Sequence, residues 1–166
     1  MQILVTGGAG YIGSHTAVSL LENGYDVIVC DNLSNSSKSC INRIQEITNK
    51  KIKFYGIDLC DKNALRTIFE ENEISAVIHF AALKAVGESV ARPLQYYHNN
   101  LLSLLNLCEL MQEFNIKKLV FSSSATVYGT TDKMPLTENM PIGAINPYGK
   151  TKVICEEILR DLYASD

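Results

Sequence analysis

Five short apolar runs with the composition of strands alternate along this chain with five longer stretches of helical period. The runs cover residues 2–6, 26–30, 52–57, 76–80 and 118–122. The helical stretches cover residues 11–23, 38–48, 62–72, 93–114 and 147–163. This alternation predicts an α/β fold, a doubly wound parallel sheet of five βα units with helices on both faces.

The residues at the ends of the predicted helices agree with these boundaries. Gly24 follows the first helix, where a left-handed residue is expected, and Asp61 and Asn146 precede later helices as N-caps. Pro93 and Pro147 occupy first-turn positions, where a missing N–H costs no hydrogen bond. The helix ends are therefore predicted from local chemistry as well as from periodicity.

Length and the end of the pattern set the expected domain organisation. With 166 residues, 46% of them hydrophobic, the chain can form one compact domain, residues 1–166, and hardly two. Residues 130–145 contain prolines and glycine without a period and are expected to form a long functional loop. The pattern ends on a helix, which would leave the run 118–122 at an apolar sheet edge that native chains usually cover. We therefore expect this sequence to be part of a longer protein.

Charge and composition argue against several kinds of ligand. Fifteen Lys and Arg against eighteen Asp and Glu give a net charge of −3, so neither nucleic acid nor a membrane surface is expected as a partner. Five cysteines without a short repeated spacing disfavour disulfides and zinc, and three histidines without metal spacing are expected to pack or form hydrogen bonds, so no metal is expected. With no basic leader and no apolar run of about 18 residues, a cytoplasmic protein is expected.

The first predicted strand leads directly into a glycine cluster at which a helix begins. Gly8, Gly10 and Gly13 fit G-x-G-x-x-G, and Gly7, Gly10 and Gly13 fit G-x-x-G-x-x-G. Glycine at these places permits a tight turn and the close approach of a pyrophosphate, which the N–H groups at the helix start can bind. The cluster alone could be an ordinary tight turn, but a strand before it and a helix after it favour a dinucleotide site.

A carboxylate ends the second predicted strand. Asp31 lies 18 residues after Gly13, close to the spacing of about 20 expected for the acidic residue that binds an adenosine ribose. The like charge of a 2′-phosphate would disfavour NADP, and residues 32–37 contain no Arg to receive one. Asp31 therefore predicts NAD as the cofactor, and a solvated turn residue is the alternative.

Two residues at the start of the last predicted helix form a candidate catalytic pair. Tyr148 and Lys152 are four apart and share a helical face, and a nearby ammonium favours the phenolate that a tyrosine needs to act as a base. This spacing is common by chance, so its weight comes from the dinucleotide motif earlier in the chain. The serines at 122–124 end the fifth strand, at the sheet edge where open α/β sheets bind ligands, so a hydroxyl there could hold a substrate or tyrosine oxygen. For Ser122 and Ser123 the alternative of a purely structural strand end stays open.

Several motifs together resemble one known family. The glycine turn, the run YGKTK from residue 148 and the strand-end serines are similar to the extended short-chain dehydrogenases/reductases. The resemblance is most specific to the UDP-glucose 4-epimerases, through IGSHT from residue 12, DNL from 31, HFAALKAVGESV from 79, YY and NN from 96 and 99, and FSSSATVYG from 121. It spans essentially the whole chain but only about the first half of that family's usual length, so the family's substrate domain is missing.

The resemblance implies roles for individual positions. Gly7, Gly10, Tyr11, Ile12 and Gly13 would wrap the pyrophosphate of NAD, and Asp31, Asn32 and Ser36 would surround the adenosine ribose. Asp58 and Leu59 would border the adenine, Phe80 and Ala81 would follow the cofactor, and Lys84 and Asn99 would reach its polar groups. Tyr148 would be the catalytic base, Lys152 its electrostatic partner and a nicotinamide-ribose ligand, and Ser124 the bridge between Tyr148 and the sugar 4-hydroxyl. Tyr148 and Ser124 would therefore contact the substrate.

The reaction that the resemblance implies is an NAD-dependent interconversion of UDP-glucose and UDP-galactose by transient oxidation at C4, a step of galactose metabolism. Related dehydratases carry an Asp-Glu pair after the fifth strand, where this chain has Ala125 and Thr126, so epimerisation is favoured over dehydration. Two alternatives stay open. One is an epimerase of N-acetylated UDP-sugars, and the other is an NAD-binding module without turnover, because this chain alone is expected to be inactive.

The helix predicted at 93–114 is apolar around most of its circumference. One face suits the sheet, and the remainder needs another cover. The helix is either fully buried or, as the resemblance implies, pairs with the helix at 147–163 in a symmetric homodimer, and the dimer is the favoured prediction. In the last helix, Cys155 is expected to lie in the core and Glu156 and Glu157 to be solvated.

Overall fold

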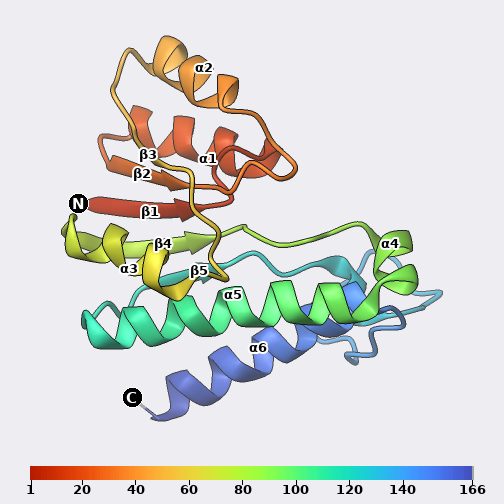
Figure 1. Cartoon of the computed structure of the whole chain (residues 1–166). Coiled ribbons are helices and arrows are strands. Elements are labelled where there is room, and N and C mark those ends of the chain that lie inside the picture. Colours follow the sequence, from red (N-terminus) through yellow and green to blue (C-terminus); the bar gives the residue numbers. More distant parts are fainter. Residues whose placement is uncertain (166) are drawn as a thin grey trace. The chain divides into compact units, whose positions relative to one another are not determined.

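The computed structural model describes residues 1–165 and contains one five-stranded parallel sheet of order β3-β2-β1-β4-β5 (Figure 1). The strands are β1 (Gln2–Thr6), β2 (Asp26–Cys30), β3 (Lys53–Tyr55), β4 (Ile74–His79) and β5 (Leu119–Phe121). The α-helices are α1 (Tyr11–Glu22), α2 (Ser39–Thr48), α3 (Lys62–Glu70), α4 (Val86–Ala91), α5 (Pro93–Glu113) and α6 (Pro147–Ser165), and η1 (Ala125–Tyr128) is a 3₁₀-helix. The predicted fold class, a doubly wound parallel sheet, is confirmed.

The chain divides into two compact units. The first comprises residues 1–81 and 105–122 and contains the whole sheet, α1, α2 and α3. The second comprises residues 82–104 and those from 123 on, and contains α4, η1 and α6. Helix α5 contributes its first part to the second unit and its last part to the first.

The first unit is built on two apolar cores, one on each face of its sheet. Because successive side chains of a strand point to opposite faces, Leu4 packs with Ile68 of α3 and Leu107 of α5, whereas Val5 packs with Leu21 of α1. These five side chains are at most 2% exposed, and burying each stabilises the fold by about 2 kcal/mol. Burial on both faces explains why the strands are nearly continuous apolar runs.

The strand order creates a topological switch point within the first unit. β1 pairs with β2 on one side and with β4 on the other, so the direction of winding reverses between β1 and β4. In open α/β sheets, ligands bind beside the carboxyl ends of the strands at such a switch point. The residues that directly follow β1 and β4 are Gly7 and Phe80, and both were predicted to contact a cofactor.

The predicted ends of the helices are confirmed at the level of single hydrogen bonds. Asp61 accepts a hydrogen bond from Ala64 N at 3.0 Å, and Asn146 Oδ1 accepts one from Gly149 N at 2.8 Å. Gly24 has the left-handed φ of +83° that ends α1. The loop predicted at 130–145 contains no helix or strand.

Several boundaries differ from the prediction. β3 is shorter than the predicted run 52–57, because only three of its residues pair with β2. Helices α4 and η1 were not predicted, since elements of six and four residues are too short to show a period. β5 forms an edge of the sheet, and Val120 there is 61% exposed, as expected for an apolar edge strand. Among the helices of residues 1–165, none is long and apolar enough to cross a membrane.

Candidate functional site

The glycine turn between β1 and α1 is packed so closely that side chains do not fit in it. Gly7 has φ of +68°, and a Cβ there would lie 2.6 Å from Ala81 N. A Cβ on Gly13 would overlap the carbonyl oxygen of Gly7, which already accepts a hydrogen bond from Gly10 N at 3.1 Å. The first helical turn begins after Gly10, which has no capping side chain, and it carries no acidic residue. The turn therefore leaves backbone N–H groups for an anion at a helix N-terminus.

Asp31 connects this glycine turn to the segment after β2. Its Oδ2 accepts a hydrogen bond from Ala9 N at 3.0 Å, and its Oδ1 accepts from Leu33 N at 2.9 Å and from Ser36 Oγ at 2.8 Å. A carboxylate offers about four acceptor positions, so these three bonds leave capacity for a ligand hydroxyl. Asp31 is 8% exposed. Asp31 is therefore a buried, hydrogen-bonded carboxylate and not the solvated turn residue that was the alternative.

A second carboxylate extends this polar edge. Asp58 Oδ2 accepts from Asn32 Nδ2 at 2.9 Å, and Asp58 Oδ1 accepts from Cys60 N at 2.8 Å. Burial raises the pKa of Asp58, but hydrogen bonds from Cys60 N, the Asn32 amide and the Cys60 thiol outweigh burial and hold the pKa below its ordinary value. The Leu59 side chain lies in the core at 4% exposure, so any contact between Leu59 and a ligand must come from its main chain.

Apolar side chains complete the first unit's group of predicted residues. Phe80 N donates to Thr6 O at 3.0 Å, which holds the residues after β4 beside the end of β1. Tyr11 and Ile12, at the start of α1, are 78% and 56% exposed. Large apolar side chains exposed directly after a glycine turn suit contact with a bound molecule.

The predicted acid–base pair lies in the second unit, at the start of α6. Lys152 Nζ lies 6.0 Å from the centroid of the Tyr148 ring. Lys152 is 4% exposed, and burial lowers its pKa from 10.5 to about 8, an effect that Cys155 partly opposes. Tyr148 itself is half-buried. A largely protonated ammonium is therefore held 6.0 Å from the Tyr148 ring centroid at neutral pH.

Ser124 is brought to the same region by a residue that the sequence did not single out for a role. Ser124 caps η1, and its Oγ accepts from Thr126 N at 3.2 Å and from Thr126 Oγ1 at 2.9 Å. Thr126 in turn packs against Gly149, where a Cβ would lie 2.9 Å from Thr126 O. Thr126 thus places the Ser124 hydroxyl near the backbone that carries Tyr148.

Asn100 is linked to the helical turn that carries Tyr148 and Lys152 through a hydrogen bond to Thr151. Its amide is 3% exposed, donates to Thr151 Oγ1 at 3.0 Å and exchanges hydrogen bonds with Leu83 N and O at 2.8 and 3.0 Å. Thr151 Oγ1 donates to Tyr148 O at 2.7 Å. Asn99 Nδ2 also donates to Asn100 Oδ1, at 3.0 Å. Asn100 was predicted only as part of a motif, and no local pattern indicates partners that lie 17 and 51 residues away.

Two further contacts stabilise the second unit. Tyr96 is fully buried, donates to Glu88 Oε2 at 2.8 Å and accepts from Ala85 N at 3.1 Å. Burial, followed by Glu88 and the charge of Tyr148, raises the pKa of Tyr96 to about 12. The Ser123 hydroxyl donates to the Glu156 carboxylate, so Glu156 is a partly buried, hydrogen-bonded residue and not a fully solvated one, whereas Glu157 is exposed as expected. Ser123 is likewise more than a strand end.

The remaining candidates behave as packing residues. Cys155 is 1% exposed, and burial raises the pKa of its thiol to about 11, so it is a core residue as predicted. His79 is buried, forms a hydrogen bond with Thr6 Oγ1 at 2.7 Å and stacks on Phe121. Within residues 1–165, no three histidine, cysteine or carboxylate side chains cluster as a metal site would require.

The predicted site residues therefore fall into two groups. The first unit brings together the pyrophosphate, ribose and adenine candidates, and it also contains Phe80 and Ala81. The second unit brings together Tyr148, Lys152 and Ser124 and includes Asn99. Lys84 also belongs to the second unit, where its side chain is exposed between β4 and α4.

Sequence comparison relates this chain to one family model and to curated proteins of about twice its length. Residues 4–166 match the family model described as GDP-mannose 4,6 dehydratase. The chain is 62% identical over 166 residues to the UDP-glucose 4-epimerase of Bacillus subtilis (strain 168), a match that covers 100% of this chain and 49% of that protein. The chain spans about half the length of the curated relatives that it matches.

Solved structures agree with the sequence comparison. The crystal structure of UDP-glucose 4-epimerase from Bifidobacterium longum in complex with NAD+ and UDP matches with a TM-score of 0.98 at 52% identity, covering 100% of this chain and 50% of that one. The UDP-Glc/GlcNAc 4-epimerase from Campylobacter jejuni matches with a TM-score of 0.94 at 39% identity, covering 99% of this chain and 50% of that one.

Proposed function

Because the chain belongs to the family that the GDP-mannose 4,6-dehydratase model describes, we propose that residues 1–166 are the NAD-binding part of an enzyme that interconverts UDP-glucose and UDP-galactose. Two observations, one in each unit, carry the proposal. The switch-point edge of the first unit is lined by a glycine turn that excludes side chains, and a buried lysine stands beside a tyrosine in the second unit. The matching structures are those of 4-epimerases of UDP-sugars, one of them with NAD+ and UDP.

The residues of the first unit fit the adenosine and pyrophosphate parts of NAD. The N–H groups after Gly10 suit a pyrophosphate, because they begin a helix whose first turn carries no acidic residue, and Gly7 and Gly13 allow the backbone of this turn to pack closely. The remaining acceptor position of Asp31 suits a ribose hydroxyl, and its charge disfavours the 2′-phosphate of NADP. Asp58 and the main chain of Leu59 would border the adenine, and Tyr11, Ile12, Asn32, Ser36, Phe80 and Ala81 complete the proposed set.

The residues of the second unit fit the chemistry at C4 of the sugar. When bound, NAD supplies the hydride acceptor. Tyr148 takes the proton of the sugar 4-hydroxyl, and the Lys152 ammonium stabilises the phenolate and binds the nicotinamide ribose. Ser124 holds the 4-hydroxyl oxygen, and Lys84 and Asn99 bind polar groups of the cofactor.

The residues after β5 favour epimerisation over dehydration. An elimination needs a general acid and base near the reacting carbons, and the related dehydratases supply an Asp-Glu pair there. This chain has Ala125 and Thr126, and the Thr126 hydroxyl is used as a donor to Ser124. The family name therefore describes the shared fold and cofactor chemistry better than the reaction that we propose.

A second substrate class is favoured by one observation. The Campylobacter jejuni structure is named for UDP-Glc and GlcNAc together, so N-acetylated UDP-sugars are the alternative substrates. An NAD-binding module without turnover is the alternative for these 166 residues alone, because about half of the Bacillus subtilis and Bifidobacterium longum enzymes has no counterpart in this chain.

We extend the proposal to assembly and cellular setting. The enzyme would be a homodimer paired through residues 93–114 and 147–163, in the cytoplasm, acting in galactose metabolism. The dimer is supported by large apolar side chains exposed on the two helices, with Leu94 82% and Leu105 41% exposed on α5 and Tyr163 89% exposed on α6. A monomer in sedimentation velocity at micromolar concentration would contradict the dimer.

Two experiments test the function. Titration calorimetry with NAD and NADP should show one NAD site and much weaker NADP binding, and absence of NAD binding would overturn the proposal. In the complete protein, Tyr148→Phe should abolish conversion of UDP-galactose while leaving NAD bound. Assay of the 166-residue chain loaded with NAD separates the enzyme from the binding module, and turnover by this chain would refute the expected need for the other half.

A further inference from the structure

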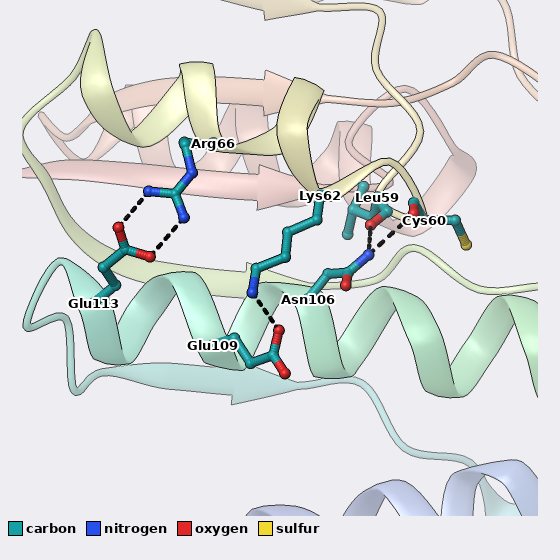
Figure 2. A network of polar contacts seen from close by, with 7 residues as sticks. All are labelled: Leu59, Cys60, Lys62, Arg66, Asn106, Glu109 and Glu113. Atoms are coloured by element: carbon teal, nitrogen blue, oxygen red, sulfur yellow. Dashed lines mark hydrogen bonds and ion pairs between the residues drawn. The ribbon is translucent and has the colours of Figure 1, made fainter.

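A buried amide on α5 holds the turn between β3 and α3. Asn106 Nδ2 donates to two successive carbonyl oxygens, Leu59 O at 2.8 Å and Cys60 O at 3.1 Å (Figure 2). Asn106 is 5% exposed, and its partners lie 46 and 47 residues earlier in the chain. A donor shared by two adjacent carbonyls fixes both the position and the orientation of the peptide between them.

The turn that Asn106 holds is the one that carries Asp58. Asp58 O accepts from Asp61 N at 3.0 Å, and Asp58 Oδ1 accepts from Cys60 N at 2.8 Å. The other carboxylate oxygen accepts from Asn32 Nδ2 at 2.9 Å. A continuous chain of hydrogen bonds therefore runs from α5 through this turn to the residue after Asp31.

Two ion pairs join α3 to α5 beyond the amide, both on the same side of Asn106. Lys62 Nζ lies 2.5 Å from Glu109 Oε2, and Arg66 forms a two-pronged pair with Glu113 (Figure 2). These side chains are 31 to 55% exposed, and such exposed pairs contribute little to stability. A buried amide donor, by contrast, would leave two carbonyls without their partner if it were removed. Asn106, and not the ion pairs, is therefore the contact that determines where the turn lies.

We propose that Asn106 is a positioning residue for cofactor binding, which holds the Asp58–Leu59 backbone in the place where it borders the adenine. This inference rests on the proposed function, because the role of Asp58 and Leu59 at the adenine belongs to that proposal. Asn106 touches no ligand itself. It acts through the two carbonyls that it holds and through the Asp58–Asn32 hydrogen bond beyond them.

The test compares two overlapping parts of the cofactor as separate probes, ADP-ribose with the adenine and nicotinamide mononucleotide without it. Asn106→Leu keeps the branched shape and the number of non-hydrogen atoms of the side chain and removes the donor, so ADP-ribose should bind about tenfold more weakly by calorimetry. Nicotinamide mononucleotide should bind with unchanged affinity. Asn106→Gln keeps an amide donor and should recover most of the ADP-ribose affinity. If Asn106 served only to fill space in the core, the larger Gln side chain would not restore that affinity.

Controls separate this inference from its surroundings. Glu109→Gln and Glu113→Gln remove the exposed ion pairs and should leave the affinity for ADP-ribose within about twofold of the wild type. If Asn106→Leu does not fold, Asn106→Ser, whose hydroxyl is too short to reach both carbonyls, carries the same expectation. Equal ADP-ribose affinity in the wild type and in Asn106→Leu or Asn106→Ser would overturn the positioning role alone. A wild type that does not bind ADP-ribose would overturn this inference together with the proposed function.

Discussion

The buried lysine of the second unit makes a quantitative prediction about stability. Burial lowers the pKa of Lys152 from 10.5 to about 8, so the folded state holds its ammonium less favourably than the unfolded chain does. At pH 7 this difference costs about 3 kcal/mol of folding free energy. Lys152→Met keeps a chain of similar length without the charge, and it should stabilise the protein by about that amount at pH 7.

The stability difference between the wild type and Lys152→Met depends on pH. The unfolded state binds more protons than the folded state between pH 8 and 10.5, so the stability of the wild type relative to the variant rises with pH in that window. The cost is fully present below about pH 8 and disappears above about pH 10.5. At pH 9.5 the advantage of Lys152→Met should therefore fall to about 1.5 kcal/mol.

Urea unfolding followed by circular dichroism at pH 7 and pH 9.5 measures this difference. Lys150→Met is the matched control, because Lys150 is exposed two residues away on α6, and it should change stability by less than about 0.5 kcal/mol at both pH values. An advantage of Lys152→Met that is the same at both pH values would refute the reasoning. So would a variant that is less stable than the wild type at pH 7. In the complete protein, the same substitution should abolish turnover, since it removes the proposed electrostatic partner of Tyr148.

Three further substitutions test the geometry of the two units. Gly13→Ala forces a Cβ onto the backbone of the glycine turn and should cost about 1–3 kcal/mol in urea unfolding, whereas Gly87→Ala, which has open space around it, should not destabilise the protein. Asn100→Leu removes the hydrogen-bond partner of the N–H and carbonyl of Leu83 and should lower the free energy of unfolding by about 2–4 kcal/mol. Unchanged stability would contradict the importance of these hydrogen bonds. Asp31→Ala should weaken NAD binding about tenfold or more by calorimetry, and an unchanged dissociation constant would remove its proposed role.

The parts of this molecule that could be predicted are those with local signals. β1, β2 and the glycine turn follow from an apolar run that ends in residues with special backbone requirements, and Gly7 has the positive φ that only glycine adopts readily. Asp61 and Asn146 are predictable as caps because a cap bonds within its own turn. The fold class followed because the order of strands and helices admits few topologies.

The parts that could not be predicted depend on partners far away in the sequence. Asn100 and Asn106 sit in a helix whose leucines dominate its pattern, and nothing local shows that their amides bond to backbone 17 and 46–47 residues earlier. Glu156 has the sequence context of a solvated helix residue, yet it accepts a hydrogen bond from Ser123, 33 residues before it. Short elements such as α4 show no period in the sequence.

Following a deuterium label at C4 of the sugar tests the central claim most directly. The complete protein, incubated with NAD and [4-²H]UDP-galactose, should yield UDP-glucose that keeps deuterium at C4, with turnover lost in Tyr148→Phe. Retention is expected because the hydrogen removed from C4 returns to the same carbon on its other face without exchanging with solvent. Exchange of the label with solvent, or conversion that proceeds without NAD, would contradict the account.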